Sequence, residues 1–115
     1  MITLYGIRNC DTCRKAWKWL EDQGVDYRFH DLRRDGVDRA TIDQWMDAVG
    51  DLLLVNRKGR TWRELPPERR AGLDDAALRA LLAEQPTLVK RPVVAWPDGA
   101  ITVGFDPAQW QRRIG

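Results

Sequence analysis

The sequence has little cysteine and no long apolar segment, and both shortages exclude classes of protein. Only two of its 115 residues are cysteine, too few for the disulfide framework of a small secreted domain. No apolar run reaches the roughly 20 residues that a membrane-spanning helix needs. The first residues also lack the basic and then apolar pattern of a signal peptide. We therefore expect a cytoplasmic chain that does not associate with membranes.

A single histidine, His30, and a net charge of +2 are equally restrictive. Two cysteines and one histidine fall short of the four good ligands that structural zinc prefers, so we expect no metal. The mild charge gives no support for direct binding of nucleic acid. Hydrophobic residues make up 43% of the chain and charged residues 31%, a balance typical of a folded protein. We expect one domain, residues 1–115.

The first third of the chain predicts a strand, a helix and a second strand. Residues 2–5 have strand-forming composition. A helix is expected over residues 10–23, with Gly24 as its C-cap. Its apolar stripe, at i, i+3, i+4 and i+7, consists of Cys13, Ala16, Trp17 and Leu20. Residues 26–32 form the second strand, which the right-handed crossover rule places parallel to the first.

The middle of the chain predicts helices and no strands. Its expected elements are a turn at 33–36, a helix at 38–49, a short helical turn and loop at 51–65, a turn opened by Pro66-Pro67, and a helix at 74–84. The inward side chains of the last helix are expected to be Ala77, Leu78, Leu81 and Leu82. We interpret this region, approximately residues 37–86, as a helical insertion.

The C-terminal part predicts a hairpin and a final helix. Strands at 93–96 and 101–103 flank a turn of Pro, Asp, Gly and Ala. Asp106-Pro107 is typical of a helix N-cap followed by proline at the first helical position, and the helix runs to about residue 113. The order of elements predicts an α/β, thioredoxin-like fold: a mixed four-stranded sheet with an inserted helical block.

Cys10 is the leading candidate for a reactive group, because it lies at the start of the first helix. Unpaired amides and the helix dipole stabilise a thiolate there, and the thiolate is the nucleophilic form of cysteine. Arg8, Arg14 and Lys15 are close in sequence and are expected to strengthen the effect. A buried packing cysteine is the structural alternative.

Cys13 and Pro92 are each open to two interpretations. Cys13 either resolves a mixed disulfide formed on Cys10, as in dithiol redox sites, or packs in the core as an inert residue. Pro92 either lies beside the cysteine or simply begins an edge strand.

Arg57 and Arg91 are the best candidates for binding an anion. Each belongs to a cluster of basic residues, and the planar guanidinium suits oxyanions and carboxylates. An oxyanion next to a thiolate needs such charge compensation. The alternative is a salt-bridged surface arginine, which is the commoner fate of a single arginine.

Several motifs together resemble those of the arsenate-reductase-like family, which includes YffB-type proteins and the Spx transcriptional regulators. The matching segments are TLYGIRNCDTCRKA (3–16), LVNR (54–57), TWREL (61–65), Pro86, KRPVV (90–94) and Gly104-Phe105. They cover nearly the whole chain. This chain is most similar to the YffB-type proteins.

The resemblance implies specific roles for residues of this chain. In the glutaredoxin-dependent arsenate reductases, the cysteine matching Cys10 attacks arsenate and the arginines matching Arg57 and Arg91 hold the oxyanion. A mixed disulfide with glutathione follows, and glutaredoxin resolves it. Pro92 matches the cis-proline of the fold. Those reductases carry a third arginine where this chain has Gly104.

The resemblance therefore implies a glutathione-linked thiol–disulfide reductase that uses Cys10 as its nucleophile, with glutathione or glutaredoxin as redox partner and a small oxyanion or disulfide as substrate. The alternative function is an Spx-like redox-sensing regulator that binds the RNA polymerase α subunit. In that case Cys10 and Cys13 form the switch, since a C-x-x-C pair at this place is shared with Spx.

Overall fold

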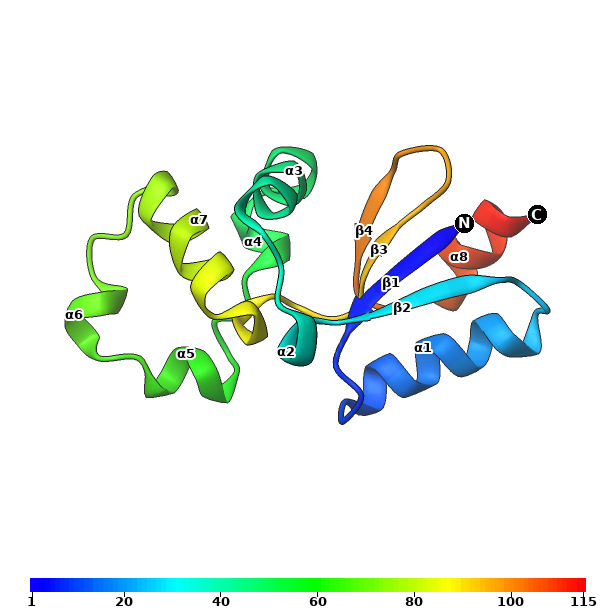
Figure 1. Ribbon diagram of the computed structural model, residues 1–115, viewed down its shortest axis with the longest axis horizontal. Helices are drawn as coiled ribbons and strands as arrows, with labels where there is room; N and C mark the ends of the chain where they lie inside the picture. The colour runs from blue at the N-terminus through cyan, green and yellow to red at the C-terminus, as the bar shows by residue number, and fades with distance from the viewer. The chain divides into compact units, whose positions relative to one another are not determined.

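The computed structural model describes residues 1–115 and divides into two compact units, which are described separately (Figure 1). The first unit consists of residues 1–31 and 91–115, and the second consists of residues 32–90. The second unit therefore enters the chain between the second and third strands of the first. None of the helices is long and apolar enough to cross a bilayer.

The first unit is a four-stranded sheet with two helices. Its elements are β1 (Ile2–Gly6), α1 (Asp11–Asp22), β2 (Tyr27–Asp31), β3 (Val93–Ala95), β4 (Ile101–Val103) and α8 (Pro107–Ile114). The strand order is β2-β1-β3-β4. β1 and β2 are parallel, whereas β1 with β3 and β3 with β4 are antiparallel. The mixed four-stranded sheet predicted from the sequence is confirmed.

The core of the first unit is built on the apolar positions of β1, α1 and β3. Leu4, Ala16, Leu20, Val94 and Trp110 are completely buried in one cluster. The Trp110 ring makes edge-to-face contacts with three other aromatic rings of the unit, those of Trp19, Trp96 and Phe105. Because the buried residues Ala16 and Leu20 of α1 pack in this cluster, α1 is held against the sheet, and its N-terminus is held with it.

The second unit consists of helices and loops, with one isolated antiparallel bridge between Val55 and Val89. Its elements are α2 (Leu32–Asp35), α3 (Arg39–Val49), α4 (Asp51–Leu54), α5 (Arg60–Glu64), α6 (Pro67–Arg70), α7 (Asp75–Glu84) and the 3₁₀ turn η1 (Pro86–Leu88). Two backbone hydrogen bonds join residues far apart in this unit. The backbone amide of Asn56 donates to the carbonyl of Leu88 (2.8 Å), and the backbone amide of Lys90 donates to the carbonyl of Leu54 (2.8 Å). These bonds tie the exit of the unit to its middle.

Two local predictions for this unit are wrong in detail. Residues 32–35 form a single helical turn rather than the expected turn at 33–36, because Leu32 is completely buried and the Gly36 amide closes the turn on its carbonyl. Ala77 is exposed rather than inward. The buried positions are Leu78, Leu81 and Leu82, and Ala77 precedes them by about 100° around the helix.

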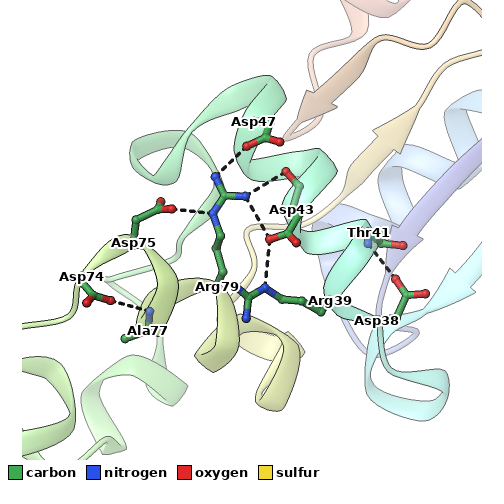
Figure 2. A network of polar contacts seen from close by, with 9 residues as sticks. All are labelled: Asp38, Arg39, Thr41, Asp43, Asp47, Asp74, Asp75, Ala77 and Arg79. Atoms are coloured by element: carbon green, nitrogen blue, oxygen red, sulfur yellow. Dashed lines mark hydrogen bonds and ion pairs between the residues drawn. The ribbon is translucent and has the colours of Figure 1, made fainter.

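Polar contacts join α3 to α7 through one guanidinium (Figure 2). Arg79 of α7 binds Asp43 (3.1 Å) and Asp47 (2.8 Å) of α3, and Asp75 (2.8 Å) of its own helix. The Arg79 side chain is only 17% exposed. Asp47 and Asp75 therefore depend on this single, largely buried cation for compensation, whereas Asp43 also binds Arg39 (3.0 Å).

Candidate functional site

Cys10 is the N-cap residue of α1. Its backbone is extended (φ −135°, ψ 121°), its carbonyl accepts the amide of Arg14 (2.9 Å), and its side chain makes no capping hydrogen bond to the helix backbone two or three residues ahead. The thiol is half-buried and free of any disulfide. This places the sulfur beside the unpaired amides of the first helical turn, where negative charge is stabilised.

The pKa of Cys10 is set by competition between burial and hydrogen bonding. Partial burial raises it, because the thiolate loses hydration. The Cys13 amide, the Cys13 thiol and the Arg91 guanidinium favour the thiolate and lower the pKa, and together they outweigh burial. The net effect is a Cys10 pKa below its ordinary value. The thiolate is thus more abundant at neutral pH than in an unperturbed cysteine.

Cys13 differs from Cys10 in both its burial and the direction of its pKa shift. It is completely buried, and burial raises its pKa to about 12, helped by the adjacent Cys10 sulfur. Gly6 allows this burial, since a Cβ at Gly6 would lie 2.6 Å from the Cys13 sulfur. Cys13 therefore stays protonated and serves Cys10 as a hydrogen-bond donor.

Arg91 and Pro92 connect the site to the sheet. The peptide bond between them is cis, as the family resemblance implies. The Pro92 carbonyl accepts the amide of Gly104 (2.8 Å). Gly104 has φ +88°, a conformation that L side chains rarely adopt. The position at which the reductases carry a third arginine therefore favours glycine here for reasons of backbone geometry.

Arg57 belongs to the second unit, where it has partners of its own. Its guanidinium binds Asp51 (3.0 Å) and lies over the Trp62 ring, 5.4 Å from the centroid. The Arg57 side chain is 39% exposed, so its outer edge is open to an anion. The sequence predicted Arg57 as a binding residue but gave no signal for the pairing with Asp51.

Two of the cations next to Cys10 in sequence do not act on its sulfur. Arg14 binds Asp11 (2.6 Å), and Arg8 lies over the Phe29 ring, 5.1 Å from the centroid. The cation that acts on the sulfur is Arg91, from a distant part of the chain. The described side chains include no cluster of three or more His, Cys, Asp or Glu that could hold a metal ion.

The contrast between the two cysteines predicts a selective reaction. Iodoacetamide at neutral pH should add a single carbamidomethyl group to the folded protein, on Cys10, because only that thiol is accessible and has a lowered pKa. The protein denatured before alkylation should take two groups. Intact mass followed by peptide mapping checks the result. Two groups on the folded protein would contradict the burial of Cys13.

Comparison with known proteins finds closely similar chains over the full length. A solved structure of a YffB protein is 37% identical with a TM-score of 0.93, and each chain covers 100% of the other. An arsenate reductase (ArsC) related protein from Brucella melitensis is 47% identical over 98% of this chain and 93% of that one, with a TM-score of 0.75. An uncharacterized protein of Haemophilus influenzae is 42% identical over 99% of both chains.

More distant relatives bear on the fold and on the alternative function. The global transcriptional regulator Spx of Lactiplantibacillus plantarum is 23% identical over 99% of this chain and 86% of its own. A glutaredoxin from Archaeoglobus fulgidus is 14% identical with a TM-score of 0.53, and this likeness concerns the fold alone. The predicted thioredoxin-like α/β fold is confirmed. The ArsC family pattern matches residues 5–113, and the chain therefore belongs to the ArsC family.

Proposed function

We propose that the chain is a glutathione-linked thiol–disulfide reductase in which the Cys10 thiolate is the nucleophile. The observation that carries the proposal is the pair of unequal cysteines at the start of α1: Cys10 is accessible with a lowered pKa, and Cys13 is buried with a raised one. Only one sulfur is prepared to attack, and such a site works through an external thiol. Glutathione is the external thiol that the family suggests.

The proposed cycle has two exchanges, each conserving electrons. The Cys10 thiolate attacks the glutathione sulfur of a mixed disulfide G–S–S–R, which forms Cys10–S–S–G and releases R–S⁻. A glutathione thiolate then attacks the glutathione sulfur of Cys10–S–S–G, which releases the Cys10 thiolate and forms oxidised glutathione. Glutaredoxin is the alternative acceptor in the second step. Cys13 donates a hydrogen bond to the departing Cys10 thiolate and so makes it a better leaving group.

The arginines fit an anionic partner. Arg91 hydrogen bonds the Cys10 sulfur, and Arg57 keeps an open edge beside Trp62. We assign to each arginine separately an anionic group, either a carboxylate of glutathione or a small oxyanion. Arsenate is the less suitable substrate, since a doubly charged oxyanion needs the third positive charge that Gly104 does not provide.

Intact mass after incubation with oxidised glutathione tests this proposal. The reduced protein should gain one glutathione, and peptide mapping should place it on Cys10. The Cys10→Ser variant should gain none and should lose reductase activity, because no other accessible thiol is available. Cys13→Ser is the matched control: it should keep the adduct, since Cys10 remains and the serine hydroxyl still offers a donor.

Two outcomes would count against the proposal. An unmodified wild-type protein would remove glutathione from the mechanism. An internal Cys10–Cys13 disulfide would show that Cys13 attacks despite its raised pKa, and it would favour the dithiol switch.

An Spx-like regulator is the second candidate, supported by the Spx relatives that align with 99% of this chain and by the C-x-x-C pair. Its test is a pull-down with the RNA polymerase α subunit in oxidised and in reduced buffer. Binding that depends on the Cys10–Cys13 redox state would favour the regulator. No binding in either buffer would exclude it.

A further inference from the structure

The second unit contains a cavity of about 390 Å³ whose lining includes Arg57 but no cysteine. This volume falls within the range of small-molecule sites, about 300–1,000 Å³. We call it the Arg70 cavity. Its lining residues that matter here are Arg57, Trp62, Arg70, Leu73 and Leu78, together with three aspartates.

The three aspartates of the cavity are already engaged. Asp51 binds Arg57 (3.0 Å), and Asp75 binds Arg79 (2.8 Å). Asp74 is the N-cap of α7 and accepts the amide of Ala77 (2.7 Å). The three aspartates therefore have partners within the protein. A ligand is more readily held by a polar side chain of the lining that has no such partner.

Arg70 is the lining side chain without such a partner. It is the last residue of α6, and it forms no ion pair with any of the aspartates that line the cavity. Its Nε is buried and makes no hydrogen bond. Because the Arg70 guanidinium is not held by a carboxylate, its exposed part is available to a ligand carboxylate that enters the cavity.

The remaining lining selects the rest of the ligand. Leu78 is buried, and Leu73 and Trp62 are partly buried, so these three side chains offer an apolar and aromatic wall. Two guanidinium groups face three carboxylates in this lining. Arg79 also compensates Asp75, so the local charge is close to neutral, which favours a single negative charge over a dianion such as phosphate.

From this combination we propose that the Arg70 cavity binds a small monocarboxylate with an apolar body, its carboxylate on the Arg70 guanidinium and its body against Trp62, Leu73 and Leu78. The site lies within the second unit and involves no cysteine. Its occupancy can therefore be measured without any reaction at Cys10, although Arg57 is also one of the proposed anion-binding residues.

Titration of the ¹⁵N-labelled full chain with 3-phenylpropionate tests the proposal. The indole signal of Trp62, assigned from a Trp62→Phe variant, should shift with saturation. The alcohol 3-phenylpropan-1-ol, which has the same body without the charge, should bind much more weakly. Inorganic phosphate should leave the Trp62 signal in place.

Variants assign the effect to the arginine. Arg70→Gln should weaken binding of 3-phenylpropionate by about tenfold, the scale of one charge-assisted hydrogen-bond pair. Arg63→Gln is the matched control, since it removes the same charge from an exposed residue of the same unit outside the cavity, and it should bind as wild type. Unchanged dispersion of the amide signals verifies that both variants fold.

Three outcomes would overturn the assignment. They are equal binding of the acid and the alcohol, unchanged affinity in Arg70→Gln, and absence of any saturable shift at high-millimolar probe. Comparable binding of phosphate would instead show that the cavity selects charge without regard to the apolar body, and it would reject the monocarboxylate.

Discussion

Replacing Arg79 by methionine should lower the thermal unfolding midpoint by several degrees. Methionine preserves the length of the buried stem, so the main loss is the positive charge that holds Asp43, Asp47 and Asp75 (Figure 2). Without it, Asp47 and Asp75 lose their cation and Asp43 keeps only Arg39, so the carboxylates of two packed helices repel one another at neutral pH. Circular dichroism during heating measures the midpoint.

Two controls separate charge from packing in this experiment. Adding Asp43→Asn to Arg79→Met should recover part of the lost midpoint, because one of the repelling charges is removed. Lys18→Met should change the midpoint very little, since Lys18 and Asp22 form an exposed pair (3.8 Å) of the kind that contributes little. A double variant no more stable than Arg79→Met would show that the defect lies in packing.

The pH dependence of stability should change with Arg79 as well. Hydrogen bonds from Arg39 and Arg79 lower the pKa of Asp43 in the folded protein. A lowered carboxyl pKa stabilises the fold above the unfolded value, about 3.9, and this contribution is lost as pH falls through the folded value. The wild type should therefore lose more stability on acidification than the Arg79→Met variant does.

Signals that act over a few residues were readable from the sequence. Asp106 followed by proline predicted the start of α8, and in the structure the Asp106 carboxylate accepts the Gln109 amide (3.2 Å). The apolar stripe of α1 predicted the burial of Cys13, Ala16 and Leu20. Such signals depend on helix geometry alone, so no tertiary information is needed.

Signals that act across the fold could not be read in this way. Arg14 was expected to support Cys10 because it is near in sequence, yet it binds Asp11. The residue that acts on the sulfur is Arg91, which follows the whole helical unit. The same holds for Arg79, whose aspartate partners lie on two helices, α3 and α7. Side chains brought together by packing leave no local pattern in the chain.

Gly6 is an intermediate case. A glycine at the end of β1 was consistent with an ordinary strand terminus. In the structure its missing side chain leaves the space that the Cys13 sulfur occupies, 2.6 Å from where a Cβ would be. The sequence shows that residue 6 is glycine but not why glycine is needed there, because the cause is a contact between a strand and a helix.

Replacing Arg91 by methionine should raise the pH at which Cys10 becomes reactive, because a nearby opposite charge favours the thiolate. The guanidinium both hydrogen bonds the sulfur and attracts its negative charge, and methionine provides neither. The measurement is the rate of alkylation by iodoacetamide as a function of pH, which follows the thiolate fraction. Arg14→Met is the matched control and should leave the midpoint unchanged, since Arg14 is held by Asp11.

The same substitution should alter the pH dependence of stability, with a definite sign. The folded pKa of Cys10 lies below the unfolded value, about 8.5, so its contribution to stability is complete above that pH and disappears as pH falls through the folded value. Burial raises the pKa of Cys13 to about 12, so its contribution is complete below 8.5 and declines as pH rises toward 12. Arg91→Met should shrink the first contribution and leave most of the second. Denaturation by urea across this pH range measures both contributions. In the alkylation experiment, an unchanged midpoint in Arg91→Met would mean that the helix N-terminus and Cys13 set the acidity of Cys10 without the arginine.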